Sequence, residues 1–119
     1  MLVNKLVHEM SGYMQTLDQT FMALSDGTRR AIVARLADGE APISELATPF
    51  DMSLTAVSKH VRVLSDAGLI TVSKRGRTRY CRLEGGPMRQ AVAWLNDYRR
   101  FWDANFEALA AFLEEDEQP

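Results

Sequence analysis

Two helix-forming segments are separated by a turn of only three residues between residues 43 and 67, and this spacing constrains the fold most strongly. The first segment, ELATPF, is short, and we expect Ser44 to act as its N-cap. The turn DMS follows, and Ser53 is positioned to cap a longer helix over 54–67 that Gly68 ends. A short helix, a tight turn and a longer helix are typical of the helix-turn-helix motif.

A basic hairpin is expected directly after this motif, over residues 69–84. Residues 69–73 and 78–83 alternate in the manner of strands, and the sequence KRGR between them supplies a glycine for the turn. In the second strand we expect Cys81 to face the interior and its neighbours to face outward. A helix-turn-helix followed by a basic hairpin predicts a winged helix.

Helical periodicity predicts further helices on both sides of these elements. The helices expected before them cover residues 2–14, 17–24 and 27–36. Asp26 is the expected N-cap of the third of these helices, and Gly39 follows its end. One long amphipathic helix is expected over 88–113, followed by a flexible tail at 114–119. The expected fold class is mainly α with a small β-hairpin, as a single winged helix-turn-helix domain over 1–119.

Basic residues are concentrated in one region of an otherwise acidic chain. The formal net charge is −2, yet residues 59–82 contain seven basic residues and one acidic residue. Such an asymmetry indicates a localised anionic partner. A merely solvated surface is the alternative interpretation, and the helix-turn-helix and hairpin pattern around this region weighs against it.

The 54–67 helix has separate apolar and polar sides when its residues are placed about 100° apart. Val57, Val61 and Leu64 form the stripe expected to be buried, and we interpret His60 beside them as a partly buried structural residue. Short hydroxyls on the polar side can approach base edges closely, while lysine and arginine reach guanine or phosphate. We therefore predict that this side and the hairpin bind double-stranded DNA. The residues predicted for this role are Thr55, Ser58, Lys59, Arg62, Lys74, Arg75, Arg77 and Arg79.

Three segments, FMALSDGTRRAIVARLADGE, ISELATPFDMSLTAVSKHVRVLSDAGLI and KRGRTRYCRLE, resemble the ArsR family of winged-helix bacterial transcriptional regulators. The resemblance implies a homodimeric repressor that leaves its operator DNA when a small-molecule or protein inducer binds. It adds Leu54 to the major-groove contacts Thr55, Ser58 and Lys59, and it assigns residues 74–79 to the wing. We include the capping residue Ser53 in the same DNA-binding set. Gly27 departs from the family, which often has proline there.

No metal, cofactor or catalytic activity is expected. Metal-sensing members of the family carry cysteines in the first helix of the motif, or carboxylate and histidine ligands on the last helix. ISELATPF contains no cysteine, and residues 88–119 contain neither histidine nor cysteine. The chain also lacks a nucleophile–histidine–carboxylate grouping, a P-loop and a dinucleotide-binding fingerprint, so we do not expect an enzyme.

The single cysteine, Cys81, fits a reducing compartment, and the sequence contains neither a membrane span nor a signal peptide, so we expect a cytoplasmic protein. Two alternatives stay open at this point. One is a regulator that responds to oxidation of Cys81, and the other is a winged helix that binds protein in place of DNA.

The terminal helices carry more apolar surface than one small core needs. A helix over 88–113 is about 39 Å long at about 1.5 Å per residue. We expect its apolar face and residues 1–16 to form a two-fold interface, which would set two recognition helices about 34 Å apart on DNA. A terminal helix folded over its own core is the alternative. The predicted interface residues are Leu6, Met10, Leu95, Tyr98, Trp102, Phe106 and Leu109.

Overall fold

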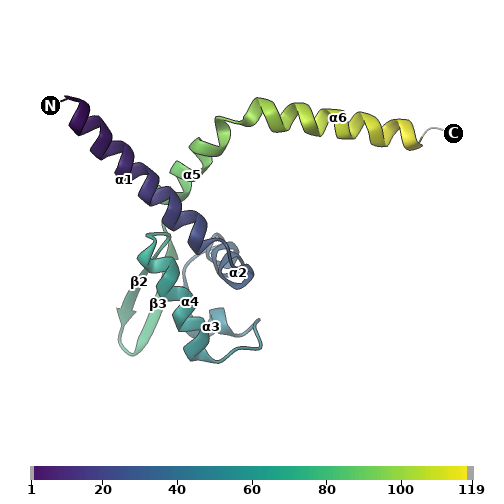
Figure 1. Ribbon diagram of the computed structural model, residues 1–119. Helices are drawn as coiled ribbons and strands as arrows, with labels where there is room; N and C mark the ends of the chain where they lie inside the picture. The colour runs from purple at the N-terminus through teal and green to yellow at the C-terminus, as the bar shows by residue number, and fades with distance from the viewer. Residues whose placement is uncertain (1, 118–119) are drawn as a thin grey trace.

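The computed structural model describes residues 2–117 and has the predicted winged helix-turn-helix architecture (Figure 1). In chain order its elements are α1 (Leu2–Ala23), α2 (Gly27–Leu36), β1 (Ala41–Pro42), α3 (Ile43–Ala47), α4 (Leu54–Asp66), β2 (Ile70–Arg75), β3 (Thr78–Leu83), α5 (Gly86–Asn96) and α6 (Arg99–Glu117). The helix-turn-helix is formed by α3 and α4, and β2 and β3 form the wing.

The hydrophobic core lies where α2, α3, α4 and the wing meet. From α4 it receives Val57, Val61 and Leu64, which are at most 3% exposed. These three residues occupy one side of the helix, as their spacing predicted. Burying each aliphatic side chain stabilises the fold by about 1.5–3 kcal/mol, so the stripe determines how α4 is rotated about its axis. The polar side of α4 is therefore held away from the core.

The sheet contains one strand that the sequence did not predict. Its order is β1-β3-β2, and β1 pairs antiparallel with β3, with Ala41 opposite Cys81. Both of these residues are fully buried. A two-residue strand is too short to produce an alternating pattern, and Pro42 removes one donor. This pairing joins the base of the wing to the segment that leads into α3.

Two of the three predicted helix N-caps are confirmed. The Asp26 side chain accepts a hydrogen bond from the backbone N–H of Arg29, and the Ser53 side chain accepts one from Ala56. The cap predicted at Ser44 is wrong, because α3 starts two residues earlier than that cap implies and its N-cap is Pro42, with no side-chain hydrogen bond. A proline fits the start of a helix well, since its missing N–H is not needed there.

The predictions for the N-terminal helices were wrong about continuity. One helix, α1, replaces the two helices expected over 2–14 and 17–24. The residues between those ranges do not interrupt it. The Thr16 hydroxyl donates a hydrogen bond to the Gly12 carbonyl, and the Thr20 hydroxyl donates to the Thr16 carbonyl in the same way, so both threonine hydroxyls are bonded within the helix.

The long helix predicted over 88–113 is divided into α5 and α6. At the junction the backbone N–H groups of Asp97 and Tyr98 donate to carbonyls three residues earlier, which tightens the last turn of α5. The Trp94 ring contacts Phe21 of α1 on one side and Tyr98 on the other, with ring centroids 5.7 and 5.1 Å apart. Residues 114–117, expected in the tail, are helical, whereas 118–119 lie outside the described residues.

Figure 1 shows that α5 crosses α1, whereas α6 extends away from the rest of the molecule. The contact between α1 and α5 includes a long hydrogen bond, 3.5 Å, from the Tyr13 hydroxyl to the Gln90 carbonyl. Within residues 2–117, no helix combines the length and the apolar character that a membrane crossing requires.

Gly68 is a sensitive position because it ends α4 with a φ of +77°, and an added Cβ would lie 3.4 Å from Pro87 Cγ. We predict that Gly68→Ala lowers the free energy of unfolding by about 1 kcal/mol or more, since alanine is strained at positive φ. Urea denaturation followed by circular dichroism measures the change. Gly86→Ala is the control, because its Cβ would meet no atom within 4 Å. Equal midpoints for the two variants would contradict this account of the α4 terminus.

Candidate nucleic-acid interface

The exposed side of α4 carries the polar residues predicted to contact DNA. Thr55, Lys59 and Arg62 are exposed, and Ser58 is half-buried at the edge facing the wing. Leu54, expected as a DNA contact from the family resemblance, is 51% exposed. The first two turns of α4, which begin at the Ser53 cap, therefore present hydroxyl, ammonium and apolar groups to the outside.

The pairing of β2 with β3 sorts the basic residues of the wing onto two faces. Directly opposed residues of an antiparallel pair project to the same face. The pair formed by Val72 and Cys81 packs on the core, and we call the face on which it lies the inner face. Lys74 and Arg79 form the next pair on this inner face. The pairs on the other face, the outer face, are Arg75 with Thr78, Ser73 with Tyr80, and Thr71 with Arg82.

Two outer-face arginines are engaged by glutamates. Arg75 forms an ion pair with Glu40 and lies over the Tyr80 ring, 3.8 Å from its centroid. Arg82 pairs with Glu84 at 3.0 Å. The hydrogen bond from Thr71 and then the one from Arg82 lower the pKa of Glu84. This face of the wing therefore has much of its positive charge compensated.

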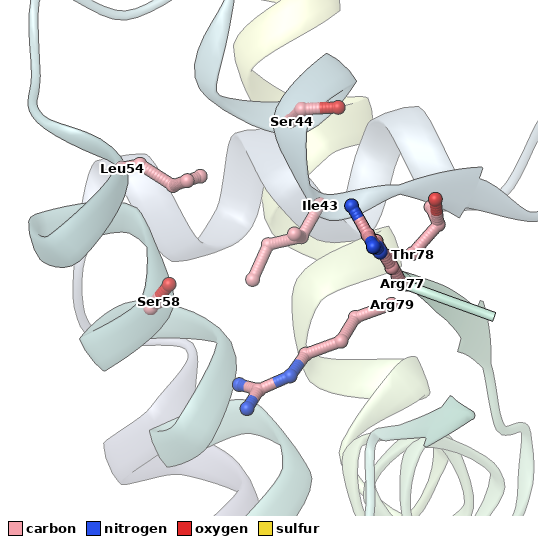
Figure 2. Close-up of a pocket in the computed structure, with 7 residues that line it drawn as sticks. All are labelled: Ile43, Ser44, Leu54, Ser58, Arg77, Thr78 and Arg79. Atoms are coloured by element: carbon pink, nitrogen blue, oxygen red, sulfur yellow. The ribbon is translucent and has the colours of Figure 1, made fainter. Parts of the chain in front are cut away.

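A crevice of about 320 Å³ separates the wing from the helix-turn-helix motif (Figure 2). Its lining consists of Ile43, Ser44, Leu54, Ser58, Arg77, Thr78 and Arg79. Figure 2 shows the Arg79 side chain extending from β3 across the crevice toward α4. A second hollow adjoins it and shares Ile43, Ser58 and Arg79, while adding Arg62 of α4.

The structure thus brings together five of the ten DNA-binding residues predicted from the sequence, and Ser53, Thr55, Lys59, Lys74 and Arg75 do not line the crevice or the hollow. Leu54, Ser58, Arg77 and Arg79 meet at the crevice, and Arg62 lies at the adjoining hollow. Arg75 does not join them, because it lies on the outer face with Glu40. Three lining residues were not predicted as site residues: Ile43, Ser44 and Thr78. Ser44 was predicted to be a cap, and Thr78 borders the crevice although its pairing with Arg75 places it on the outer face.

His60 lies on the side of α4 that faces the start of α2. Its Nδ1 is 3.3 Å from a guanidinium nitrogen of Arg29 and 3.8 Å from Asp26 Oδ2, and its side chain is 20% exposed. The backbone N–H of Arg29 is the main cause that lowers the pKa of Asp26, and the nearby His60 adds to it. Arg29 also donates to the carbonyls of Ala23 and Met22, so it links the end of α1 to α4. The partly buried, structural role predicted for His60 fits these contacts.

Comparison with known proteins identifies the family. A family model described as a helix-turn-helix domain matches residues 24–73. The HTH-type transcriptional regulator Rv2034 of Mycobacterium tuberculosis is 37% identical over 97 residues, which cover 82% of this chain and 88% of that protein. The crystal structure of an ArsR family transcriptional regulator, RHA00566, is 44% identical with a TM-score of 0.69, covering 75% of this chain and 92% of that one. The chain belongs to the ArsR family of transcriptional regulators.

A third similarity concerns a DNA-binding domain. The solution structure of the homodimeric winged helix-turn-helix DNA-binding domain of Mb0332 from Mycobacterium bovis, described as a possible ArsR-family regulator, is 26% identical. Its TM-score is 0.61, and the match covers 76% of this chain and 86% of that one. Family membership and the winged helix together make this chain a DNA-binding transcriptional regulator.

The terminal helices of this ArsR-family regulator expose a large apolar surface. Leu6 and Met10 of α1 are 54% and 61% exposed, and Phe106 of α6 is 66% exposed. Of the other predicted interface residues, Leu95, Tyr98 and Leu109 are exposed, and Trp102 is half-buried. Trp102, Phe106 and Leu109 also border a shallow hollow formed along α6.

Cys81 is fully buried in the core of the ArsR fold, and burial raises the pKa of its thiol. A thiol that responds to oxidants must be accessible to them and must form a thiolate readily. Cys81 is buried and its pKa is raised, so it meets neither condition. The structure therefore supports the packed role predicted for Cys81 over the redox alternative. Among the described residues, no three histidine, cysteine or acidic side chains are grouped closely enough to hold a metal ion.

We predict that Cys81 of the folded protein reacts with a dithiobis-nitrobenzoate reagent on the order of a hundredfold more slowly than in urea, since the reagent must wait for an opening of the core. Absorbance of the released thiolate measures both rates. Cys81→Ser is expected to lower the free energy of unfolding by about 1–3 kcal/mol by burying a hydroxyl. Equal reaction rates with and without urea would revive the thiol-responsive alternative.

Proposed function

We propose that this chain is a sequence-specific repressor that binds operator DNA as a homodimer. The observation that carries the proposal is that the polar side of α4 and the inner face of the wing border one crevice. A duplex presents a major groove and an adjacent minor groove on one side, separated by a phosphate backbone. Two elements on either side of a crevice can therefore contact both grooves at once.

Most of the predicted residues have a proposed role on the duplex. Thr55 and Lys59, in the first turns of α4, contact base edges in the major groove, with Ser53 and Leu54 at its entrance, while the half-buried Ser58 faces the wing. Arg62 and Lys74 contact phosphates. Arg77 at the wing tip enters the minor groove, where the negative potential attracts arginine. Because Arg75 is paired with Glu40, we assign it to holding the wing and not to direct contact.

The dimer is proposed to form through α1, α5 and α6. The exposed residues Leu6, Met10, Leu95, Tyr98, Phe106 and Leu109, with Trp102 among them, supply an apolar surface that a second copy would bury. A projecting helix with so much apolar surface is unfavourable in water unless it is covered. The homodimeric state of the similar Mb0332 domain supports this assignment.

Repression follows from occupancy, because a dimer bound over a promoter excludes the transcription machinery. The repressor is proposed to act in the cytoplasm, where bacterial DNA lies, and to be released by a small-molecule or protein inducer. Conventional DNA binding of this kind requires no metal, cofactor or catalytic step.

The first test uses a labelled duplex selected from a random-sequence library by binding to the full chain. We predict that the double variant Thr55→Ala, Lys59→Ala loses about 1–3 kcal/mol of discrimination between this duplex and a scrambled one for each base contact removed. Arg77→Ala should weaken binding to both duplexes and reduce the salt dependence. Fluorescence anisotropy at several salt concentrations measures these effects. Failure to select any duplex, or binding that is independent of salt, would contradict the proposal.

The second test concerns the dimer. We predict that Phe106→Asp with Leu109→Asp converts the protein to a monomer, because two carboxylates would otherwise be buried at the interface. Sedimentation equilibrium distinguishes one chain of 13.4 kDa from two. Glu107→Gln on the same helix is the control and should leave the dimer intact. A wild-type protein that sediments as a monomer would overturn the proposed interface.

A further inference from the structure

We propose that the crevice between α3, α4 and the wing is a seat for one backbone phosphate of the bound duplex, held by Arg79 together with the Ser44 and Ser58 hydroxyls. The inference rests on the proposed DNA binding and deepens it. It assigns a ligand to a specific cavity, and it brings in Ser44, which neither the predicted DNA contacts nor the roles given above include.

The lining of the crevice has the chemistry of a phosphate site. It includes Ser44, Ser58, Thr78 and two arginines, and it contains no acidic residue. Phosphate oxygens accept hydrogen bonds from hydroxyls, and arginine can bind two of them at once. The remaining lining residues, Ile43 and Leu54, are apolar. Apolar walls reduce the screening of charge by water, which strengthens the attraction between a guanidinium and a phosphate.

Arg79 is the principal donor because of its position in the strand register. It lies on the inner face, opposite Lys74, and it borders both the crevice and the adjoining hollow. Figure 2 shows its side chain directed across the crevice toward α4. The outer-face arginines already have glutamate partners, whereas the ion pairs formed among residues 2–117 do not include Arg79.

The hydroxyls complete the seat from the opposite wall. Ser44 is the second residue of α3, and its side chain is not used as the cap of that helix, so its hydroxyl can donate to a ligand. Ser58 is half-buried on α4 beside the crevice. Arg79 comes from the wing and the two serines come from the helix-turn-helix motif. A phosphate held between them would fix the wing and α4 at one angle to the duplex, which positions the protein without reading sequence.

A salt titration distinguishes Arg79 from a matched arginine. Arg79→Gln and Arg82→Gln remove the same charge from the same strand, but Arg82 lies on the outer face with Glu84. With two seats in a dimer, Arg79→Gln should lower the slope of log affinity against log salt by about 1.8, since each phosphate contact contributes about 0.9. Arg82→Gln should change it little. The affinity lost through Arg79→Gln should be the same for the selected and the scrambled duplex. Equal slopes of log affinity against log salt for the two variants would contradict the proposed phosphate site.

Neutral methylphosphonate linkages, introduced one at a time into the selected duplex, locate the phosphate itself. One position in each half-site should weaken binding of the wild-type chain roughly tenfold, the effect of losing one charge-assisted contact. Arg79→Gln should be insensitive to that same substitution, and Ser44→Ala should be partly insensitive. Circular dichroism confirms that both variants are folded. If binding of Arg79→Gln stays sensitive to methylphosphonate at every duplex position where binding of the wild-type chain is sensitive, the assignment is wrong.

Two further outcomes separate this proposal from others. Replacing chloride by inorganic phosphate at equal ionic strength should weaken DNA binding, because free phosphate competes for the crevice, and Arg79→Gln should abolish this phosphate-specific loss. No specific loss, or a loss of the same size in Arg79→Gln, would contradict the proposed phosphate site. If the wild-type chain selects no duplex, the proposed DNA binding fails and the seat fails with it. If it selects a duplex and Arg79→Gln binds that duplex as well as the wild type, the seat alone fails.

Discussion

The rotational setting of α4 is the constraint on which the interface depends. Val57, Val61 and Leu64 are buried against the core, and turning the helix far enough to hide its polar side would expose all three. Each would lose about 1.5–3 kcal/mol of burial, which is a large part of the stability of a domain of this size. The same packing that stabilises the fold therefore holds Thr55, Lys59 and Arg62 outward.

The wing obeys a second constraint, the alternation of side chains in a strand. Register fixes which basic residues face α4 and which face away, because a slip of one residue would reverse every side chain. Burial of Cys81 holds this register, so the position of Arg79 depends on a core residue two positions away. The basic cluster that looks uniform in the sequence is divided into an inner-face pair, Lys74 and Arg79, and an outer-face set engaged by glutamates.

Much of this could be predicted from the sequence because it depends on local periodicity and local hydrogen bonding. The buried stripe of α4, the caps at Asp26 and Ser53 and the left-handed Gly68 are all such features. The missed features depend on distant contacts. Glu40 and Arg75 are 35 residues apart, and nothing near either residue indicates their pairing. The corner between α5 and α6 likewise involves Phe21 of α1, and β1 exists only because β3 lies beside it.

The central claim is that α4 and the wing form a single DNA-binding surface. Amide chemical shifts recorded while the selected duplex is added to the labelled full chain test it most directly. The account predicts that residues 53–62 and 74–79 shift together and saturate at the same ratio of protein to DNA. Shifts confined to one of these segments, or concentrated on α1 and α6, would contradict it.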